Sequence, residues 1–168
     1  MINSSEVFDA VRRGYDNLEF ASANEILDYF SEIEAESVLG HVNNIKGILF
    51  EQEYMDTLAE QSVSAQLFES TNHPLTDISI LNPDGTINEI QLKATDSTSY
   101  INATITDNPD IDVVTTSEVF GNIDYEGVID SGISNSDLGD AVVETLFEDS
   151  VNPISPLSAI GWLLGLPF

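Results

Sequence analysis

Apolar residues recur along the first third of the chain at the three- and four-residue steps of a helix. Such spacing covers residues 4–18, a segment that begins at Ser22, and residues 36–61, and it predicts three amphipathic helices. Ser22 stands three residues before Glu25, which is the spacing of a capping box, so we expect the second helix to begin at this serine. We interpret these helices as scaffold.

The period then shortens to that of strands. Residues 63–68, 76–81 and 86–93 alternate polar with apolar side chains or are β-branched, which predicts three strands. The second and third flank Asn-Pro-Asp-Gly at residues 82–85, a strong turn signal, so these two strands should form a hairpin. The same segment resembles a calcium-binding loop. However, the position at which such a loop needs its first acidic ligand is occupied by Ile80, so we prefer the hairpin interpretation.

Three further elements are expected after the hairpin. They are a helix over residues 97–106 with Ser97 as its cap, a buried strand over 111–116, and a last helix over 136–147 that follows an irregular stretch containing glycine and aspartate. The order of helix, three strands, helix, strand and helix predicts an α/β fold with a central mixed β-sheet flanked by helices.

We divide the chain into three parts. Residues 1–35 are expected to form an N-terminal helical extension, residues 36–150 the α/β domain, and residues 151–168 an apolar C-terminal tail. The apolar run from Ile154 to Phe168 contains two prolines and is too short for a membrane-spanning helix. We expect this tail to pack against the domain or to be buried in a protein partner or a homodimer.

Composition excludes several classes of protein. The chain has 168 residues, with 30 Asp and Glu against 4 Lys and Arg, and a formal net charge of −26. Hydrophobic residues make up 42% of it, which excludes a disordered acidic tail. There is no cysteine, so disulfides and thiolate metal sites are excluded. The two histidines, His41 and His73, lie far apart and do not suggest zinc, and His73 is interpreted as a loop residue.

The N-terminal residues lack the pattern of a signal peptide. Glu6, Asp9, Arg12 and Arg13 stand where a secretory signal would need a basic end and then an apolar run. We therefore expect a cytoplasmic protein.

Lys93 is one of only two lysines in the chain, and it lies within a predicted strand. Side chains two residues apart share one face of a strand, so Glu89, Gln91 and Lys93 should project together. An antiparallel neighbour joined by a tight turn would bring Asp77 alongside them. Glu51, on the helix before the sheet, is the candidate for a further carboxylate.

This group of side chains suits the hydrolysis of phosphodiesters. Carboxylate and amide oxygens are hard ligands for Mg²⁺ or Mn²⁺, which activates water and neutralises charge on phosphate. The candidate metal ligands are Asp77, Glu51 and Gln91, with Glu89 as a substitute ligand on the same face. Lys93 is the candidate for positioning the water and stabilising the developing negative charge.

Three motifs in this region carry a family resemblance. Residues 46–51 read Lys-Gly-Ile-Leu-Phe-Glu and contain a Gly-x-x-Phe-Glu pattern, Asp77 follows at the start of a strand, and residues 91–93 read Gln-Leu-Lys. In this order they resemble the core of the PD-(D/E)XK, or restriction-endonuclease-like, nuclease superfamily, in the Gln-x-Lys form of the Mrr-type branch. The resemblance covers residues 45–116 and implies a restriction-endonuclease-like core and a metal-dependent DNA endonuclease with Asp77, Glu51, Gln91 and Lys93 in its site.

Each of these residues also has a structural interpretation. Lys93 would lie at a sheet edge with its ammonium group in water, or pair with Glu89. Asp77 would cap the start of its strand, and Glu51 would be a solvated helix residue.

The net charge opposes the binding of DNA. A protein that binds DNA tightly commonly makes about six to ten contacts between cations and phosphates, and this chain has four cations. Three explanations stay open: a high-salt cytoplasm, in which the Debye length falls to about 3 Å near 1 M salt; a partner in a larger assembly that binds the DNA; or a nuclease fold without activity.

The last explanation defines the alternative function, an inactive interaction module that docks through its acidic face or its apolar tail. An acidic mimic of DNA that inhibits a basic DNA-binding protein is a further functional class, and charge is its sole support.

Overall fold

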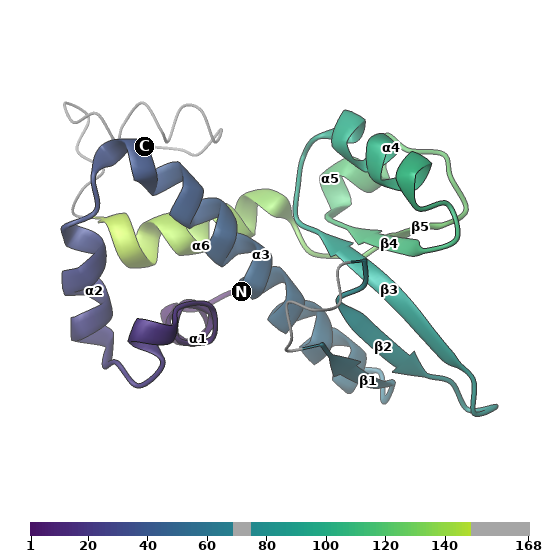
Figure 1. Cartoon of the computed structure of the whole chain (residues 1–168), viewed down its shortest axis with the longest axis horizontal. Coiled ribbons are helices and arrows are strands. Elements are labelled where there is room, and N and C mark those ends of the chain that lie inside the picture. The colour runs from purple at the N-terminus through teal and green to yellow at the C-terminus, as the bar shows by residue number, and fades with distance from the viewer. Residues whose placement is uncertain (69–74, 149–168) are drawn as a thin grey trace. The chain divides into compact units, whose positions relative to one another are not determined.

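The computed structural model describes residues 1–68 and 75–148 and contains two compact units (Figure 1). The first, which we call the helical unit, comprises Met1–Leu49 and the described part of Ser136–Phe168; the second, which we call the sheet unit, comprises Phe50–Asn135. The sequence-based division placed its boundaries at 35/36 and 150/151. The two divisions differ because helix α3 (Ala35–Glu60) contributes residues to both units.

The helical unit contains α1 (Ser4–Gly14), the short 3-10 helix η1 (Asp16–Leu18), α2 (Ala23–Ser31), the first part of α3, and α6 (Asn135–Phe147). Ser22 caps α2, because its hydroxyl accepts a hydrogen bond from the amide of Glu25 while the Glu25 carboxylate accepts from the amide of Ser22. This capping box is the one that the sequence predicts. The predicted helices over residues 4–18 and 36–61 are likewise confirmed, the first as two short helices.

Aromatic rings meet in the core of the helical unit. Phe30 makes edge-on contacts with Tyr15, His41 and Phe147, at centroid distances of 5.6 to 5.7 Å. Nδ1 of His41 lies 2.6 Å from the hydroxyl of Tyr15. Burial raises the pKa of that tyrosine. One histidine thus takes part in packing, whereas His73 lies outside the described residues.

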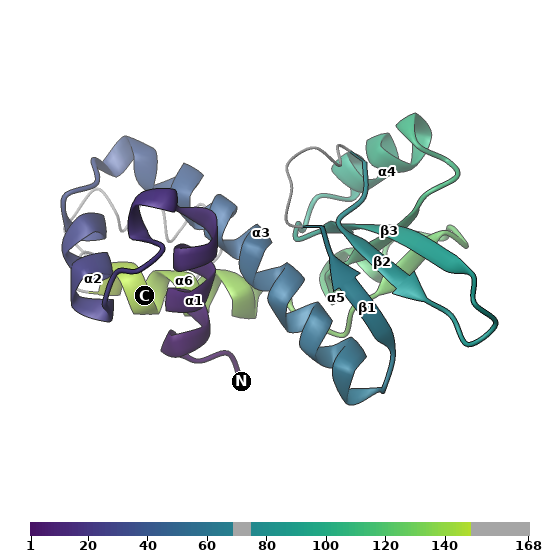
Figure 2. The ribbon, with the colours of Figure 1, turned by 60° about the horizontal axis from the view of Figure 1, so that its bottom comes forward.

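The sheet unit is built on a five-stranded mixed sheet (Figure 2). Its strands lie in sequence order, and they are β1 (Ser64–Leu67), β2 (Ile78–Leu81), β3 (Ile87–Lys93), β4 (Asp112–Thr115) and β5 (Val128–Asp130). β1, β2 and β3 pair antiparallel, whereas β3, β4 and β5 pair parallel. The parallel connections run through α4 (Thr98–Asp107) and α5 (Ser117–Phe120). The prediction of an α/β fold with a mixed sheet is therefore confirmed.

The hairpin between β2 and β3 forms around the predicted turn. The amide of Asn82 donates to the carbonyl of Thr86, and Gly85 adopts φ +84°, a conformation that glycine reaches without strain. Asp84 accepts hydrogen bonds from the hydroxyl and the amide of Thr86, which lower the pKa of its carboxyl. This carboxylate therefore stabilises a turn, as the hairpin interpretation requires.

The register of the sheet separates two faces. Ile78, Ile90 and Leu92 lie on one face and are buried. On the other face, Gln91 pairs with Val113 and Lys93 pairs with Thr115; we call this the Gln91 face. Helix α4 packs on the Gln91 face, because Ile101 of this helix belongs to a buried cluster with Val113 and Val128.

The structure contains two elements that the sequence did not predict. Helix α5 and strand β5 lie in the stretch expected to be irregular. The predicted apolar tail at residues 151–168 lies outside the described residues. Within residues 1–68 and 75–148, no helix combines the length and the apolar character needed to cross a membrane.

Candidate site at the carboxyl end of strand β3

Asp77 lies directly before β2 and is hydrogen-bonded to β3. Its amide donates to the carbonyl of Ile90 at 2.9 Å, and its carboxylate Oδ2 accepts from the amide of Leu92 at 2.7 Å. In a regular antiparallel ladder a backbone carbonyl would accept the second of these bonds. The carboxylate therefore ends the pairing of β2 with β3, and it lies against the segment Gln91-Leu92-Lys93. The interpretation of Asp77 as a cap at the start of a strand is consistent with this contact.

Gln91 is the most buried polar residue of the predicted site. It is 8% exposed, and its side-chain oxygen Oε1 has no hydrogen-bond partner. A buried oxygen without a partner costs about 1–3 kcal/mol, and most such groups in proteins are satisfied by protein atoms, bound water or an ion. A buried acceptor is therefore available on β3, in the residue before the one that Asp77 binds.

Lys93 is half-buried at the end of β3. Its ammonium nitrogen lies 5.8 Å from the centre of the Tyr100 ring on α4, a distance at which the ring attracts a cation. The interpretation in which Lys93 pairs with Glu89 is not observed, since the Glu89 carboxylate is exposed and accepts a hydrogen bond from the hydroxyl of Thr76 at 3.2 Å.

Thr115 of β4 lies on the Gln91 face but was not among the predicted site residues. It lies opposite Lys93 in the parallel ladder, is fully buried, and has a hydroxyl oxygen without a hydrogen-bond partner. Its neighbour across the next ladder, Asp130, accepts from the hydroxyl of Ser117 and the amide of Gly132. The signal in the sequence is a threonine directly after two valines in a predicted buried strand.

The remaining predicted residue, Glu51, is half-buried on α3 and interacts with other residues. Among residues 1–68 and 75–148, no three His, Cys, Asp or Glu side chains gather closely enough to hold a metal ion. Glu51, Asp77 and Glu89 thus do not form one carboxylate cluster. Asp77 is linked to β3 through the amide of Leu92, the residue next to Gln91.

One carboxylate and one amide oxygen fit a weakly held Mg²⁺ or Mn²⁺. Mg²⁺ commonly keeps several waters and is bound through one or two carboxylates together with phosphates of the substrate. The unsatisfied Oε1 of Gln91 supplies a neutral oxygen of the required hardness. Asp77 keeps its second carboxylate oxygen beyond the bond to Leu92. These donors suit a cation that the substrate helps to hold.

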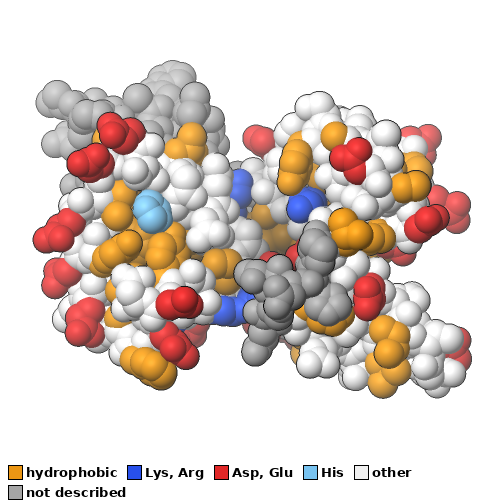
Figure 3. Space-filling model, in the orientation of Figure 1, with side chains coloured by type: hydrophobic (Ala, Val, Ile, Leu, Met, Phe, Trp, Pro, Cys, Tyr) orange, Lys and Arg blue, Asp and Glu red, His pale blue; other side chains and the backbone are white. Residues whose placement is uncertain are grey.

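The surface is dominated by acidic side chains. Figure 3 shows carboxylates spread over the visible face of each unit and few basic side chains. Arg12 is engaged within the helical unit, where it binds the Asp9 carboxylate and the carbonyl of Ala21 at 2.8 and 2.9 Å. Lys46 is buried. In the sheet unit Lys93 is the one Lys or Arg residue, and it follows Gln91 by two residues on β3.

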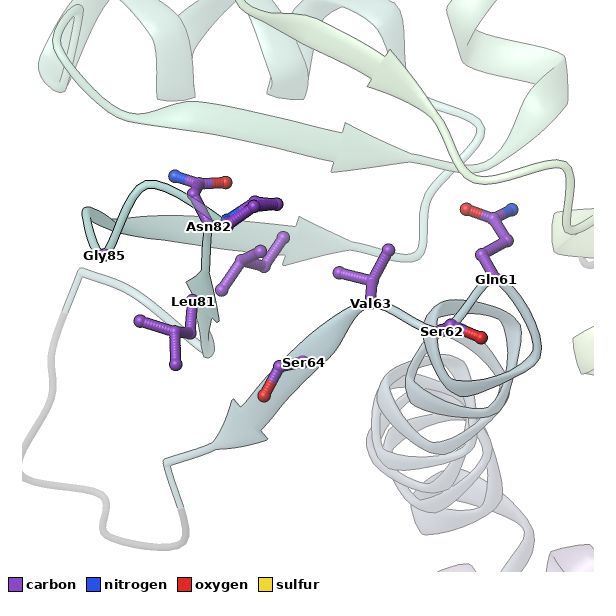
Figure 4. Close-up of a pocket in the computed structure, with 9 residues that line it drawn as sticks. Gln61, Ser62, Val63, Ser64, Leu81, Asn82 and Gly85 are labelled. Atoms are coloured by element: carbon purple, nitrogen blue, oxygen red, sulfur yellow. The ribbon is translucent and has the colours of Figure 1, made fainter.

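A separate cavity lies at the turn end of the hairpin, away from Asp77 and Lys93 (Figure 4). Its volume is about 670 Å³, and it is lined by residues 61–64, 80–83 and Gly85. None of these residues carries a charge or a nucleophile with a general base beside it. The cavity therefore offers no acid–base chemistry.

Comparison of the chain with protein-family models, with curated proteins and with solved structures gave no match.

Proposed function

We propose that the chain is a divalent-cation-dependent DNA endonuclease with a restriction-endonuclease-like core. The observation that carries the proposal is the contact of the Asp77 carboxylate with the backbone of Leu92, between Gln91 and Lys93. It supports the proposal because the Asp77 carboxylate binds the residue between Gln91, whose amide oxygen is buried without a partner, and Lys93, whose ammonium group lies over Tyr100.

The arrangement of elements supports the same proposal. Helix α3 is followed by three antiparallel strands, helix α4 and the parallel strand β4. This order and pairing agree with what the resemblance of residues 45–116 implies. The site residues stand at the carboxyl end of β3, the edge at which α/β sheets commonly bind ligands.

Each residue has a distinct role in the proposed reaction. Asp77 and Gln91 hold the cation, which when bound activates water and offsets the negative charge of the phosphate. Lys93 contacts a phosphate oxygen, where its ammonium group stabilises the charge that develops during attack. Tyr100 holds the lysine side chain beside α4 until a phosphate binds.

The net charge of −26 determines how cleavage should depend on salt. Repulsion between the acidic surface and DNA is long-ranged at low ionic strength and is confined to about 3 Å near 1 M salt. We therefore expect cleavage to increase as KCl is raised towards 1 M, the opposite of the usual loss of DNA binding with salt.

The test is nicking of supercoiled plasmid by the purified full chain with Mn²⁺ or Mg²⁺, over KCl from 0.1 to about 3 M. We expect nicking that EDTA stops and that Lys93→Ala reduces by at least about 100-fold, an effect of the size seen when one charge-stabilising donor is removed. Arg13→Ala is the matched control, because it removes one exposed positive charge on α1 and should leave nicking unchanged. Cleavage that survives Lys93→Ala would rule out the proposed site.

A second function is favoured by one observation. Among residues 1–68 and 75–148 no three carboxylates gather closely enough to hold a metal ion, and a single carboxylate is a weak basis for a metal site. The chain would then be an inactive nuclease-fold module that binds a partner through its acidic face or its tail. Two results together would support this alternative. The protein would nick no plasmid at any salt concentration, and the Lys93→Ala variant would still bind the partner that the wild type binds.

A further inference from the structure

Two oxygens on neighbouring strands of the Gln91 face are buried without partners. They are Oε1 of Gln91 on β3 and Oγ1 of Thr115 on β4, in residues that are 8% and 0% exposed. Leaving both unsatisfied would cost about 1–3 kcal/mol each. Since so few buried polar groups in proteins are truly unpaired, a pair of them in one place indicates a bound species that satisfies both.

The ladder fixes how far apart these residues are. Gln91 pairs with Val113, and Thr115 stands two residues further along β4 on the same face. From the usual spacing and rise of strands, their Cα atoms are about 8 Å apart. The two oxygens make no hydrogen bond to each other, so a link between them needs a bridging molecule.

The chemistry of the surroundings selects water. A cation between these two oxygens would have to lose its own waters and would have only a neutral amide and a hydroxyl as protein ligands, with no carboxylate among them. A water molecule is neutral, accepts from the threonine hydroxyl and donates to the amide oxygen, and polar interior sites of this kind commonly hold one.

We propose that Thr115 positions the side chain of Gln91 through one internal water. The threonine hydroxyl donates to the water, and the water donates to Oε1 of Gln91. This chain of hydrogen bonds fixes which end of the amide is the oxygen, and it leaves the second lone pair of that oxygen available. Thr115 is therefore a positioning residue, and its consequence for cation binding rests on the proposed function.

A double-mutant cycle on the full chain tests the link without any assay of activity. Thr115→Val and Gln91→Met remove the polar atoms while conserving volume. If water joins the two residues, each single variant should lower the melting temperature by about 2–4 °C, the shift that corresponds to about one lost hydrogen bond. The double variant should lose no more than the larger single loss, because the two changes break the same chain of bonds.

Thr104→Val is the matched control. Thr104 is a buried threonine whose hydroxyl donates within α4 to the carbonyl of Tyr100 at 3.0 Å, so its effect should add to that of Gln91→Met. If Thr115→Val instead leaves the melting temperature unchanged or raises it, the oxygens have no occupant and the inference fails. Additive losses in the cycle would overturn it equally.

A second measurement uses the wild-type protein. It therefore tests for the internal water even if one of the variants folds poorly. Magnetisation transfer from water to backbone amides should reveal a long-lived water near the amides of Gln91 or Thr115. Absence of such a signal would contradict the proposal. A positive cycle and signal in a protein that binds no Mn²⁺ would leave this inference intact and contradict the proposed function.

Discussion

At the scale of single residues, Asp77 combines a structural contact with a proposed chemical role. Its carboxylate accepts the amide hydrogen of Leu92 where the strands separate. The two roles require different properties of the Asp77 side chain. The hydrogen bond requires an oxygen that accepts, whereas cation binding requires a negative charge. Two substitutions at this position therefore separate the two roles.

Asp77→Asn keeps an oxygen that accepts from Leu92, and Asp77→Ala removes it. We expect the alanine variant to lose about 1.5–3 kcal/mol of unfolding free energy, the typical value for a hydrogen bond with a charged partner. The asparagine variant should lose less than half as much and yet bind Mn²⁺ at least about tenfold more weakly, because the charged ligand is gone. Urea denaturation and titration with Mn²⁺ measure the two effects; equal losses of stability in both variants would contradict the structural role.

Sequence periodicity could place Gln91, Lys93 and Asp77 in one candidate site, but it could not identify Thr115. Alternation within β3 was sufficient to place Gln91 and Lys93 on one face, and the hairpin turn placed Asp77 near them. The burial of Gln91 and Thr115 depends on the pairing of β3 with β4 and on the packing of α4, and these contacts form only after the chain folds back. Local periodicity does not contain that information, so the unsatisfied oxygens appear only in the structure.

At the scale of elements, the predicted helices and strands that carry strong local signals agree with the structure. Capping serines at Ser22 and Ser97 and the turn at residues 82–85 each fix an end or a reversal by hydrogen bonds to nearby backbone. Helix α5 and strand β5 have four and three residues, too few to show a period. Their formation depends on pairing with β4 and on packing around Val119.

The hairpin turn yields a test of its glycine. Gly85→Ala places a side chain at φ +84°, which should cost about 1 kcal/mol. Gly121→Ala is the control, because this glycine has φ −62° and an added Cβ would meet no atom within 4 Å. We expect urea denaturation to detect a loss in the first variant and little change in the second. Equal stability of the two would show that the positive φ is not strained.

Helix α6 yields a prediction of pH dependence. Partial burial, followed by the charges of Glu144 and Asp137, raises the pKa of Asp140. A carboxyl whose pKa is raised in the folded state binds its proton more tightly there, so it destabilises the fold at neutral pH and ceases to do so as pH falls. Asp140→Asn should therefore stabilise the protein at pH 7, by about 0.5 kcal/mol for a like-charge pair four residues apart.

The pH profile provides the control for this substitution. The advantage of Asp140→Asn should shrink as pH falls below the raised pKa, and it should vanish below the ordinary value of 3.8, where wild type is protonated as well. Thermal denaturation between pH 7 and pH 3.5 measures both limits. A difference that stays constant over this range would exclude the titration of Asp140 as its cause.

At the scale of the whole molecule, the net charge of −26 is the dominant physical property. Self-repulsion of this size destabilises a compact state, and salt screens it. We expect the melting temperature to rise by several degrees between 0.1 and about 2 M KCl, with most of the rise below 1 M because the Debye length shortens fastest there. A melting temperature that falls over this range would show that repulsion between carboxylates does not limit the stability of the fold.

The proposed function requires Asp77 and Gln91 to form one site for a divalent cation. Titration of the full chain with Mn²⁺ in about 1 M KCl measures this, because that salt suppresses diffuse binding to the acidic surface. We expect one site that is weakened at least about tenfold by Asp77→Asn and by Gln91→Met, since each removes one of its oxygen donors. Asp110→Asn, an exposed change in the loop before β4, should leave binding unchanged. Binding that is absent in the wild type, or that all three variants retain equally, would contradict the proposed site.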